Sequence, residues 1–349
     1  MSRPGRAIPL VERLDLTGPA PGSRQDLWLR LGQDGLGQPV AVPVALLRGR
    51  QAGPVVGLAA ALHGDELNGI GVLHRLLAEL DPMRLRGTVV ALLVTNVPGF
   101  LAGTRRYPDG YDLNHIMPGD PEGKESERYA HHLVERLIAP LDLLFDLHTA
   151  SLDRANSLYV RADLSRPEEA ALAWRQRPQI ILDSVASPTT LRGTAAAAGK
   201  PSITLEIGDP RAWQPDRIAA ASAGLRANLI GLGLLEPSDA FDLAAAPEPI
   251  VCSRSSWLRL DAGGLVEVLP ELGARVAAGE PLARLTDVFG QTRASLVAPE
   301  AGVVIGRAVS PFLRSGGRVL HLGIPAAAGE LPLIDALRAA DRPVPARPA

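Results

Sequence analysis

Four polar side chains of types that bind metals or move protons follow apolar runs of this sequence. His63 and Glu66 follow the first of three such runs, His148 follows the second, and Glu206 lies at the end of the third. Two imidazoles and one carboxylate, with a fourth position left to water, are the ligand set of a catalytic zinc ion. The remaining carboxylate is then free to act as a general base toward water. The pattern predicts a hydrolytic metal site.

These residues can meet only if the runs before them are neighbouring strands of one sheet. The runs are residues 53–62, 141–147 and 202–207, and the first is apolar on both faces, as in a strand covered by helices on both sides. Residues 67–80 then show helical spacing of apolar positions. Strands alternating with helices predict an α/β domain whose site lies beyond the carboxyl ends of the strands. The other elements expected are a hairpin within 25–53, a strand at 87–95, and helices at 125–138, 166–175 and 215–232.

The sequence pattern predicts two domains of unequal size. Residues 1–245 hold the alternating elements, and the stretch 237–249 is rich in Pro, Ala and acidic residues, as in a linker. Short apolar runs separated by glycine pairs then predict a small all-β domain at 246–325. Residues 326–349 are expected to form a C-terminal tail with one short helix.

The composition excludes several classes of function. The 349 residues include 36 Lys+Arg and 38 Asp+Glu, so the chain lacks the basic excess of a nucleic-acid-binding protein. The one cysteine, Cys252, forms neither an internal disulfide nor a thiolate zinc cluster, so a metal would need histidine and carboxylate ligands. No run approaches the roughly 18 apolar residues of a membrane span, and no secretory signal is evident. We expect a cytoplasmic protein with a small-molecule substrate.

Five motifs occur in a fixed order within residues 25–325. They are Leu62-His-Gly-Asp-Glu-Leu-Asn-Gly, Gly103-Thr-Arg-Arg-Tyr-Pro-Asp-Gly-Tyr-Asp-Leu-Asn, Pro118-Gly, Asp146-Leu-His-Thr and Thr204-Leu-Glu-Ile-Gly. Together they resemble the succinylglutamate desuccinylase/aspartoacylase family, a branch of the zinc carboxypeptidase superfamily. The resemblance implies a zinc-carboxypeptidase-like fold, with a mixed, mostly parallel sheet flanked by helices.

The resemblance also assigns roles to the residues named first. It implies one zinc ion per chain, held by His63, Glu66 and His148. Glu206 would activate the zinc-bound water. The leading prediction is therefore a zinc-dependent hydrolase, an amidohydrolase that removes the acyl group from an N-acylated amino acid or a similar small molecule. The alternatives are a carboxypeptidase-like amide or ester hydrolase for a peptide-like substrate without a free carboxylate, and a non-catalytic binding protein.

The arginines before the Asp-Leu-Asn motif are the predicted cations of the site. The resemblance implies that Arg106, or its neighbour Arg105, clamps a substrate carboxylate or polarises the scissile carbonyl. An arginine suits a carboxylate because its fork donates two parallel hydrogen bonds. We take Arg106 as the catalytic candidate and Arg105 as a substrate-binding one, with Asn114 in the same substrate pocket.

One position departs from the family pattern. The family has an arginine after Asp-Leu-Asn, where this chain has His115. A neutral imidazole offers one donor in place of a charged fork, which puts a substrate with a free α-carboxylate in doubt. Arg192 could compensate, or it could cap a helix instead. Because the metal ligands and the base are all present, altered specificity is favoured over lost activity.

The predicted β domain resembles a biotinyl/lipoyl-type barrel. A carrier domain of that type needs a lysine for cofactor attachment, and no lysine follows Lys200. A carrier function is therefore excluded. The remaining roles for this domain are to shape one side of the active-site entrance, to mediate contacts in a homo-oligomer, or to stabilise the fold.

Overall fold

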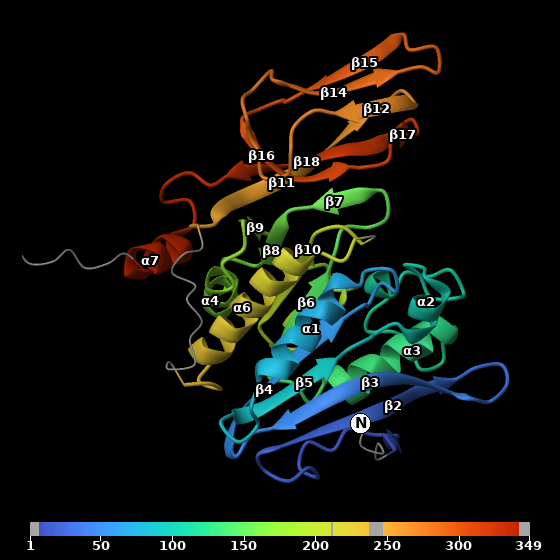
Figure 1. The fold of residues 1–349 in the computed structure, drawn as a ribbon, viewed down its shortest axis with the longest axis vertical. Coiled ribbons are helices and arrows are strands. Elements are labelled where there is room, and N and C mark those ends of the chain that lie inside the picture. The colour runs from blue at the N-terminus through green and yellow to red at the C-terminus, as the bar shows by residue number, and fades with distance from the viewer. Residues whose placement is uncertain (1–6, 211, 237–246, 342–349) are drawn as a thin grey trace, which may run out of the picture.

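One large sheet runs through the protein and positions every predicted site residue (Figure 1). In the computed structural model, residues 7–210, 212–236 and 247–341 are described. Their 14-stranded sheet has the order β1-β2-β3-β5-β4-β6-β10-β8-β9-β11-β18-β16-β13, with β7 paired to β16. The predicted α/β class, with a mixed sheet flanked by helices, is confirmed.

Three parallel strands at the centre of the sheet carry the polar residues of the candidate site at, or directly after, their carboxyl ends. They are β4 (Gln51–Ala60), β6 (Leu143–His148) and β10 (Ser202–Ile207), and β6 lies between the other two. In the register of β6 and β10, Glu206 is the partner of His148. Because the strands run in the same direction, their carboxyl ends share one edge of the sheet, as the sequence predicted.

Helices cover both faces of this central region. On one face, apolar residues of the sheet pack against α1 (Asn68–Glu79), α4 (Pro167–Arg175), α6 (Pro215–Gly231) and α7 (Pro332–Asp341). On the other face they pack against α3 (Glu125–Leu133), the π-helical turn η2 (Val134–Ile138) and α5 (Leu191–Ala197). Successive residues of β4 enter opposite cores, Leu58 on the first face and Ala59 on the second. This arrangement explains why run 53–62 has no polar face.

The outer strands complete the sheet on one side. The predicted hairpin is confirmed as β2 (Ser23–Gln33) and β3 (Pro39–Arg48), and β3 pairs with β5 (Arg86–Leu92). The short strand β1 (Leu10–Val11) lies beyond β2. Two short helices, α2 (Val97–Ala102) and η1 (Leu113–His115), lie in segment 96–124, between the predicted strand 87–95 and the predicted helix 125–138.

Four further elements near the site were not predicted. They are β7 (Arg154–Asn156), β8 (Leu158–Ala162), β9 (Ile180–Asp183) and α5. Each is only three to seven residues long, so none displays a full hydrophobic period. Strand β8 is antiparallel to β10, which makes the sheet mixed at this point.

The C-terminal region is all-β, as expected, but four of its eight strands, β11, β13, β16 and β18, belong to the large sheet. Strand β11 (Ile250–Leu260) pairs with β9 at its start and with β18 (Gly317–Pro325) along its length. A four-stranded sheet of order β15-β14-β12-β17 closes the other side of a shared apolar core. The remaining strands are β12 (Gly264–Val268), β13 (Arg275–Val276), β14 (Pro281–Thr286), β15 (Thr292–Val297), β16 (Gly302–Ala308) and β17 (Phe312–Leu313).

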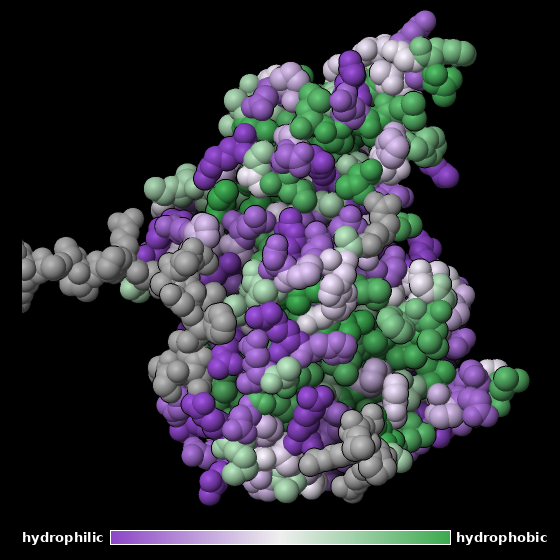
Figure 2. All heavy atoms as spheres, in the orientation of Figure 1, coloured by the Kyte–Doolittle hydropathy of each residue, from purple (hydrophilic) through white to green (hydrophobic). Residues whose placement is uncertain are grey.

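Continuous pairing therefore fixes the C-terminal strands beside the central sheet. Strand β7 pairs with β16, which adds a second bridge to the one formed by β9 and β11. The domain boundary expected at 245, most of the predicted linker, and residues 342–349 of the predicted tail lie outside the described residues. Polar and apolar side chains are interspersed on the face shown in Figure 2. Every helix among the described residues is too short or too polar to cross a membrane.

Candidate metal centre and active-site cavity

The turn after β4 brings His63 and Glu66 to the carboxyl edge of the sheet. Gly64 lies between them, where a Cβ atom would stand 2.1 Å from the carbonyl carbon of Gly99. Only glycine allows the two backbone segments to approach this closely. Helix α1 begins at Asn68, so Glu66 is held at the end of a short turn that leads directly into a helix.

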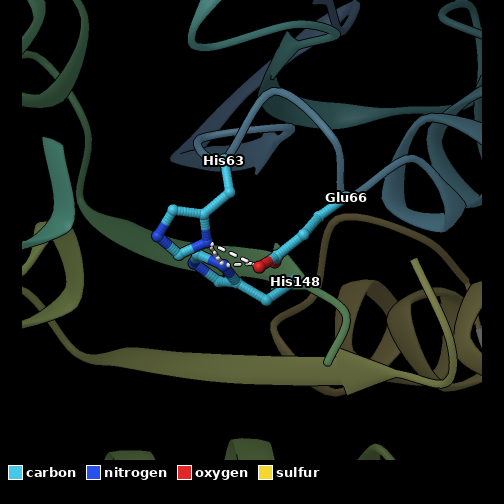
Figure 3. A group of neighbouring side chains, drawn as sticks. All are labelled: His63, Glu66 and His148. Atoms are coloured by element: carbon cyan, nitrogen blue, oxygen red, sulfur yellow. Dashed lines mark hydrogen bonds and ion pairs between the residues drawn. The ribbon is translucent and has the colours of Figure 1, made fainter. Parts of the chain in front are cut away.

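Three side chains point at one position on this edge (Figure 3). His63 Nδ1 lies 2.8 Å from one oxygen of Glu66, and His148 Nδ1 lies 3.0 Å from the other. The two Nδ1 atoms are 3.1 Å apart. All three residues are buried and form one of the groups of side chains in the described chain that could hold a metal ion.

The outer nitrogens of the two imidazoles face carboxylates. His63 Nε2 lies 3.1 Å from Asp112 Oδ1, and His148 Nε2 lies 3.0 Å from Asp146 Oδ2. A carboxylate at Nε2 favours the tautomer with the proton on that nitrogen, which leaves a lone pair on each Nδ1. Asp112 follows the loop that carries the two candidate arginines, whereas Asp146 belongs to β6.

This arrangement fits a divalent cation. Two Nδ1 lone pairs and a carboxylate, all within 3.1 Å of one another, repel unless a positive charge lies among them. Ligands on a tetrahedral zinc ion are themselves about 3.3 Å apart, given metal to nitrogen distances of about 2.0 Å. The donor set predicted from the sequence therefore fits zinc both in chemistry and in spacing.

Glu206 lies beside this cluster at the end of β10. Asn156 Nδ2 donates to Glu206 Oε2 at 3.1 Å, and Arg161 Nε lies 3.9 Å from Oε1. Only 14% of the Glu206 side chain is exposed, and burial raises the pKa of its carboxyl, while the positive charge of Arg161 opposes that shift. A buried carboxylate with a raised pKa, next to a metal site, is suited to accept a proton from water.

The two candidate arginines point in different directions. Arg105 donates to Glu66 Oε1 at 2.7 Å and to Asp112 Oδ2 at 2.9 Å, so its guanidinium lies against the cluster. Arg106 is exposed and donates to the carbonyl oxygen of Gly110 at 3.0 Å. The structure therefore brings Arg105 into the cavity of the candidate site, whereas Arg106, the candidate preferred from the sequence, lines a different surface hollow.

The three remaining predicted residues line the cavity. Asn114 Oδ1 accepts a hydrogen bond from the backbone of Leu191 at 2.8 Å, which ties η1 to the start of α5. The His115 side chain is 73% exposed, and its Nε2 is 3.8 Å from the nearest Asp112 oxygen. His115 therefore lies at the solvent side of the cavity, while Asn114 holds its wall.

Arg192 is 5% exposed and does not cap α5. Thr190 is the N-cap residue, since its hydroxyl accepts from the backbone of Gly193 at 3.0 Å. Arg192 Nη2 donates to the carbonyl of Ser184 at 2.9 Å, but Nη1 has no hydrogen-bond partner among the described residues. A buried guanidinium with an unused donor, in the wall of a cavity, is available to bind an anion.

All the site residues predicted from the sequence, except Arg106, line one cavity of about 410 Å³. Its wall also contains residues that the sequence analysis did not single out: Arg154, Asn156, Tyr159, Arg161, Trp257 and Arg318. The first four come from β7 and β8, and the last two come from β11 and β18. If β8 had been predicted as a strand, Arg161 could have been placed at this edge of the sheet. Nothing in the sequence indicated that Trp257 or Arg318 faces the same edge.

Comparison with known proteins gives the family. The sequence model of the succinylglutamate desuccinylase/aspartoacylase catalytic domain matches residues 52–232, just over half of the chain. The chain belongs to this family. The match spans the turn with His63 and Glu66, His148 at the end of β6, and Glu206 in β10.

Three individual proteins are similar to this chain over most of its length. An N-alpha-acetyl-L-2,4-diaminobutyric acid deacetylase from Halomonas elongata is 28% identical over 71% of this chain and 75% of its own length. A product-bound structure of the ectoine utilization protein EutE (DoeB) from Ruegeria pomeroyi has a TM-score of 0.78 and 27% identity, covering 89% of this chain and 97% of that one. A succinylglutamate desuccinylase from Silicibacter sp. TM1040, at 23% identity and a TM-score of 0.78, covers 90% of this chain and 97% of its own and shows the shared fold.

Proposed function

We propose that this protein is a zinc-dependent deacylase that hydrolyses the amide bond of an N-acylated amino acid. The observation that carries the proposal is the group of three acceptors, His63, Glu66 and His148, placed beside the buried carboxylate of Glu206. Family membership and the deacetylase from Halomonas elongata support the same chemistry. The cavity volume of about 410 Å³ suits a small molecule.

In the proposed reaction, the zinc ion, Glu206 and Arg105 have separate roles. A bound zinc ion would polarise the scissile carbonyl and acidify a water molecule. Glu206 then accepts the proton of the attacking water and transfers it to the leaving nitrogen. Arg105 Nη1, which lies 2.7 Å from the Glu66 carboxylate, is placed to donate to the carbonyl oxygen as negative charge develops on it.

We assign the α-carboxylate of the substrate to Arg192. Its free Nη1 and its position in the cavity wall make it a donor for an anion, and Nη2 is already fixed by Ser184. His115 is more exposed and offers at most one neutral donor at this wall. A free α-carboxylate thus remains compatible with the loss of the arginine at position 115.

Hydrolysis of a substrate series tests the proposal. The full-length protein, loaded with zinc, is assayed for amine release from N-acetyl and N-succinyl amino acids and from the corresponding α-carboxamides. We expect turnover of the acids, loss of activity with a chelator and recovery on adding zinc. Turnover of none of these acids, or activity that survives metal removal, would contradict the proposal, and a preference for the amides would contradict the role of Arg192.

The adjacent arginines provide a matched pair of variants. We expect Arg105→Gln to lower kcat by about 10²-fold at saturating zinc, because a charged donor at the developing oxyanion is lost. Arg106→Gln should stay within about twofold of the wild type, since among the described residues its guanidinium donates a hydrogen bond only to the Gly110 carbonyl. Steady-state kinetics, with metal content measured for both proteins, compares them. Equal effects of the two substitutions would contradict the assignment of Arg105.

A further inference from the structure

A second cavity lies where helix α3 and the turn η2 meet strand β2. Its volume is about 450 Å³, and it shares no lining residue with the cavity of the candidate metal centre. Helix α3 packs beside β2 toward one end of the sheet (Figure 1), and apolar residues of both elements belong to one core. Cavities of roughly 300–1,000 Å³ hold small molecules in other proteins. The proposed reaction makes no use of this one.

Three basic side chains form one wall of the second cavity. They are Arg128, His132 and Arg136. Each is four residues from the next, so they lie in one row along α3 and η2. The π-helical turn η2, which carries Arg136, is a form of helix that occurs often at functional sites. The row therefore presents two guanidinium groups and one imidazole on a single side of the helix.

The donors of the two arginines are largely unused. Arg128 is exposed, and no ion pair joins it to a carboxylate in the part of the chain that the structure describes. Arg136 Nη1 donates to the carbonyl oxygen of Arg30 at 2.8 Å. Its carboxylate neighbours, Glu12 and Glu135, are 3.9 Å and 4.0 Å away, which is too far for a hydrogen bond. Most of both guanidinium forks is free to bind a ligand.

The imidazole between the arginines also has an unused nitrogen. His132 Nδ1 is buried and has no hydrogen-bond partner among the residues described. The nearest carboxylate oxygen, from Glu135, is 3.7 Å away. Burial, and then the positive charge of Arg136, lower the pKa of His132, so the ring is neutral at pH 7. A buried polar atom without a partner is uncommon in a folded protein, and a bound ligand would supply the partner.

The rest of the lining offers hydrogen-bond acceptors. Glu12 and Glu125 both line the cavity. Glu12 Oε1 accepts from Arg30 Nη1 at 3.0 Å, which balances its charge within the protein. Glu125 Oε1 accepts from the Tyr107 hydroxyl at 3.1 Å. Carboxylates have lone pairs beyond these bonds, and hydroxyl groups of a ligand would donate to them.

We propose that this second cavity binds a phosphate monoester of a small polyol. The phosphate group would contact Arg128, His132 and Arg136, and the hydroxyl groups would donate to Glu12 and Glu125. A phosphate monoester has three terminal oxygens and nearly two negative charges, which match three donor groups and two guanidinium charges. A simple carboxylate has only two oxygens and one charge. The site stands apart from the deacylase reaction and does not depend on it.

Tyr107 connects this cavity to the candidate metal centre. It is buried in the cavity lining and lies two residues after Arg105. Its backbone amide donates to the carbonyl of Tyr111 at 2.9 Å, which closes the loop just before Asp112. A ligand hydroxyl on Glu125 would compete with the Tyr107 hydroxyl and loosen this loop. Because Arg105 and Asp112 contact the metal-centre side chains, we expect an occupied cavity to lower kcat.

Calorimetry tests the site and the class of ligand. The full-length, zinc-loaded protein is titrated with glycerol 3-phosphate, and with glycerol and acetate as comparison ligands. We expect saturable binding of glycerol 3-phosphate with a Kd at least about tenfold lower than that of acetate, and no binding of glycerol. Equal binding of acetate would contradict the phosphate class. Absence of glycerol 3-phosphate binding would overturn the proposal.

Arginine variants in the two cavities locate the binding. Arg128→Gln and Arg136→Gln should each raise the Kd for glycerol 3-phosphate at least about tenfold, because a charged donor is lost. Arg128 is exposed, so its replacement leaves the core intact. Arg318→Gln is the matched control, since Arg318 lines the cavity of the metal centre instead. An effect of Arg318→Gln alone, or a Kd unchanged in Arg128→Gln and Arg136→Gln, would overturn the site.

Kinetics tests the connection to the metal centre. At saturating N-acyl amino acid, glycerol 3-phosphate should lower kcat of the wild type at least about twofold and should leave kcat of Arg128→Gln unchanged. An increase in KM alone that persists in Arg128→Gln would place the ligand in the active-site cavity and overturn the connection. If no N-acyl amino acid is hydrolysed, the deacylase proposal fails, and calorimetry still decides whether the second site exists.

Discussion

Glu206→Gln is expected to lower kcat/KM by about 10³-fold or more while leaving zinc bound. The amide keeps the shape of the side chain and a contact with Asn156, but it cannot accept the proton of the attacking water. Zinc should stay because Glu206 is not one of the three proposed ligands. Steady-state kinetics on the preferred N-acyl amino acid, together with metal analysis of the same preparation, measures both quantities.

The control for this variant is Glu168→Gln, which makes the same change on an exposed part of α4. It should retain full activity and full metal content. Two results would refute the role of Glu206. One is activity within tenfold of the wild type, and the other is loss of zinc in parallel with activity, which would make Glu206 a ligand instead of a base.

The position of the site was predictable because the hydrophobic pattern is a local signal, and because strands that alternate with helices imply a parallel sheet. An apolar run that is unbroken on both faces is typical of an internal strand with helices on each side, and Leu58 and Ala59 of β4 do enter opposite cores. Once β4, β6 and β10 are parallel, the residues that follow them must share one edge. The placement of His63, His148 and Glu206 follows from that geometry.

The choice between Arg105 and Arg106 was not predictable in the same way. Adjacent residues in a loop have no periodicity that fixes which side chain faces inward. In the structure, Arg105 faces the site because its guanidinium forms ion pairs with the carboxylates of Glu66 and Asp112. The partner Asp112 lies seven residues further along the chain, so only the folded loop reveals the pair.

The net charge of the chain also gave no indication that arginines are concentrated in the cavity. The whole chain has a formal charge of -2, from which the sequence analysis argued against a nucleic-acid surface. Yet five arginines line one cavity of about 410 Å³: Arg105, Arg154, Arg161, Arg192 and Arg318. They come from β7, β8, β18, α5 and the loop before η1, so no stretch of sequence shows the concentration of charge. Long-range strand pairing, which has no local signal, brings them together.

Loss of one of the three proposed metal ligands is expected to remove zinc, activity and zinc-dependent stability at the same time. In His63→Ala only one imidazole and one carboxylate remain at the centre, too few to hold the ion for catalysis. The wild-type protein should unfold at a higher temperature when zinc is added, because the ion binds the folded chain and relieves the repulsion among three acceptors within 3.1 Å. Zinc at 100 times its Kd would contribute about 2.7 kcal/mol to the free energy of unfolding.

Metal analysis, kinetics and thermal unfolding with and without zinc measure these three effects. In His63→Ala we expect less than about a tenth of the wild-type zinc content, loss of activity and a Tm that no longer responds to zinc. His74→Ala is the matched control. His74 is an exposed residue of α1, the helix that begins just after the turn with His63. His63→Ala protein that kept stoichiometric zinc would show that the converging side chains are not the ligand set, and the metal-dependent mechanism would then lose its structural basis.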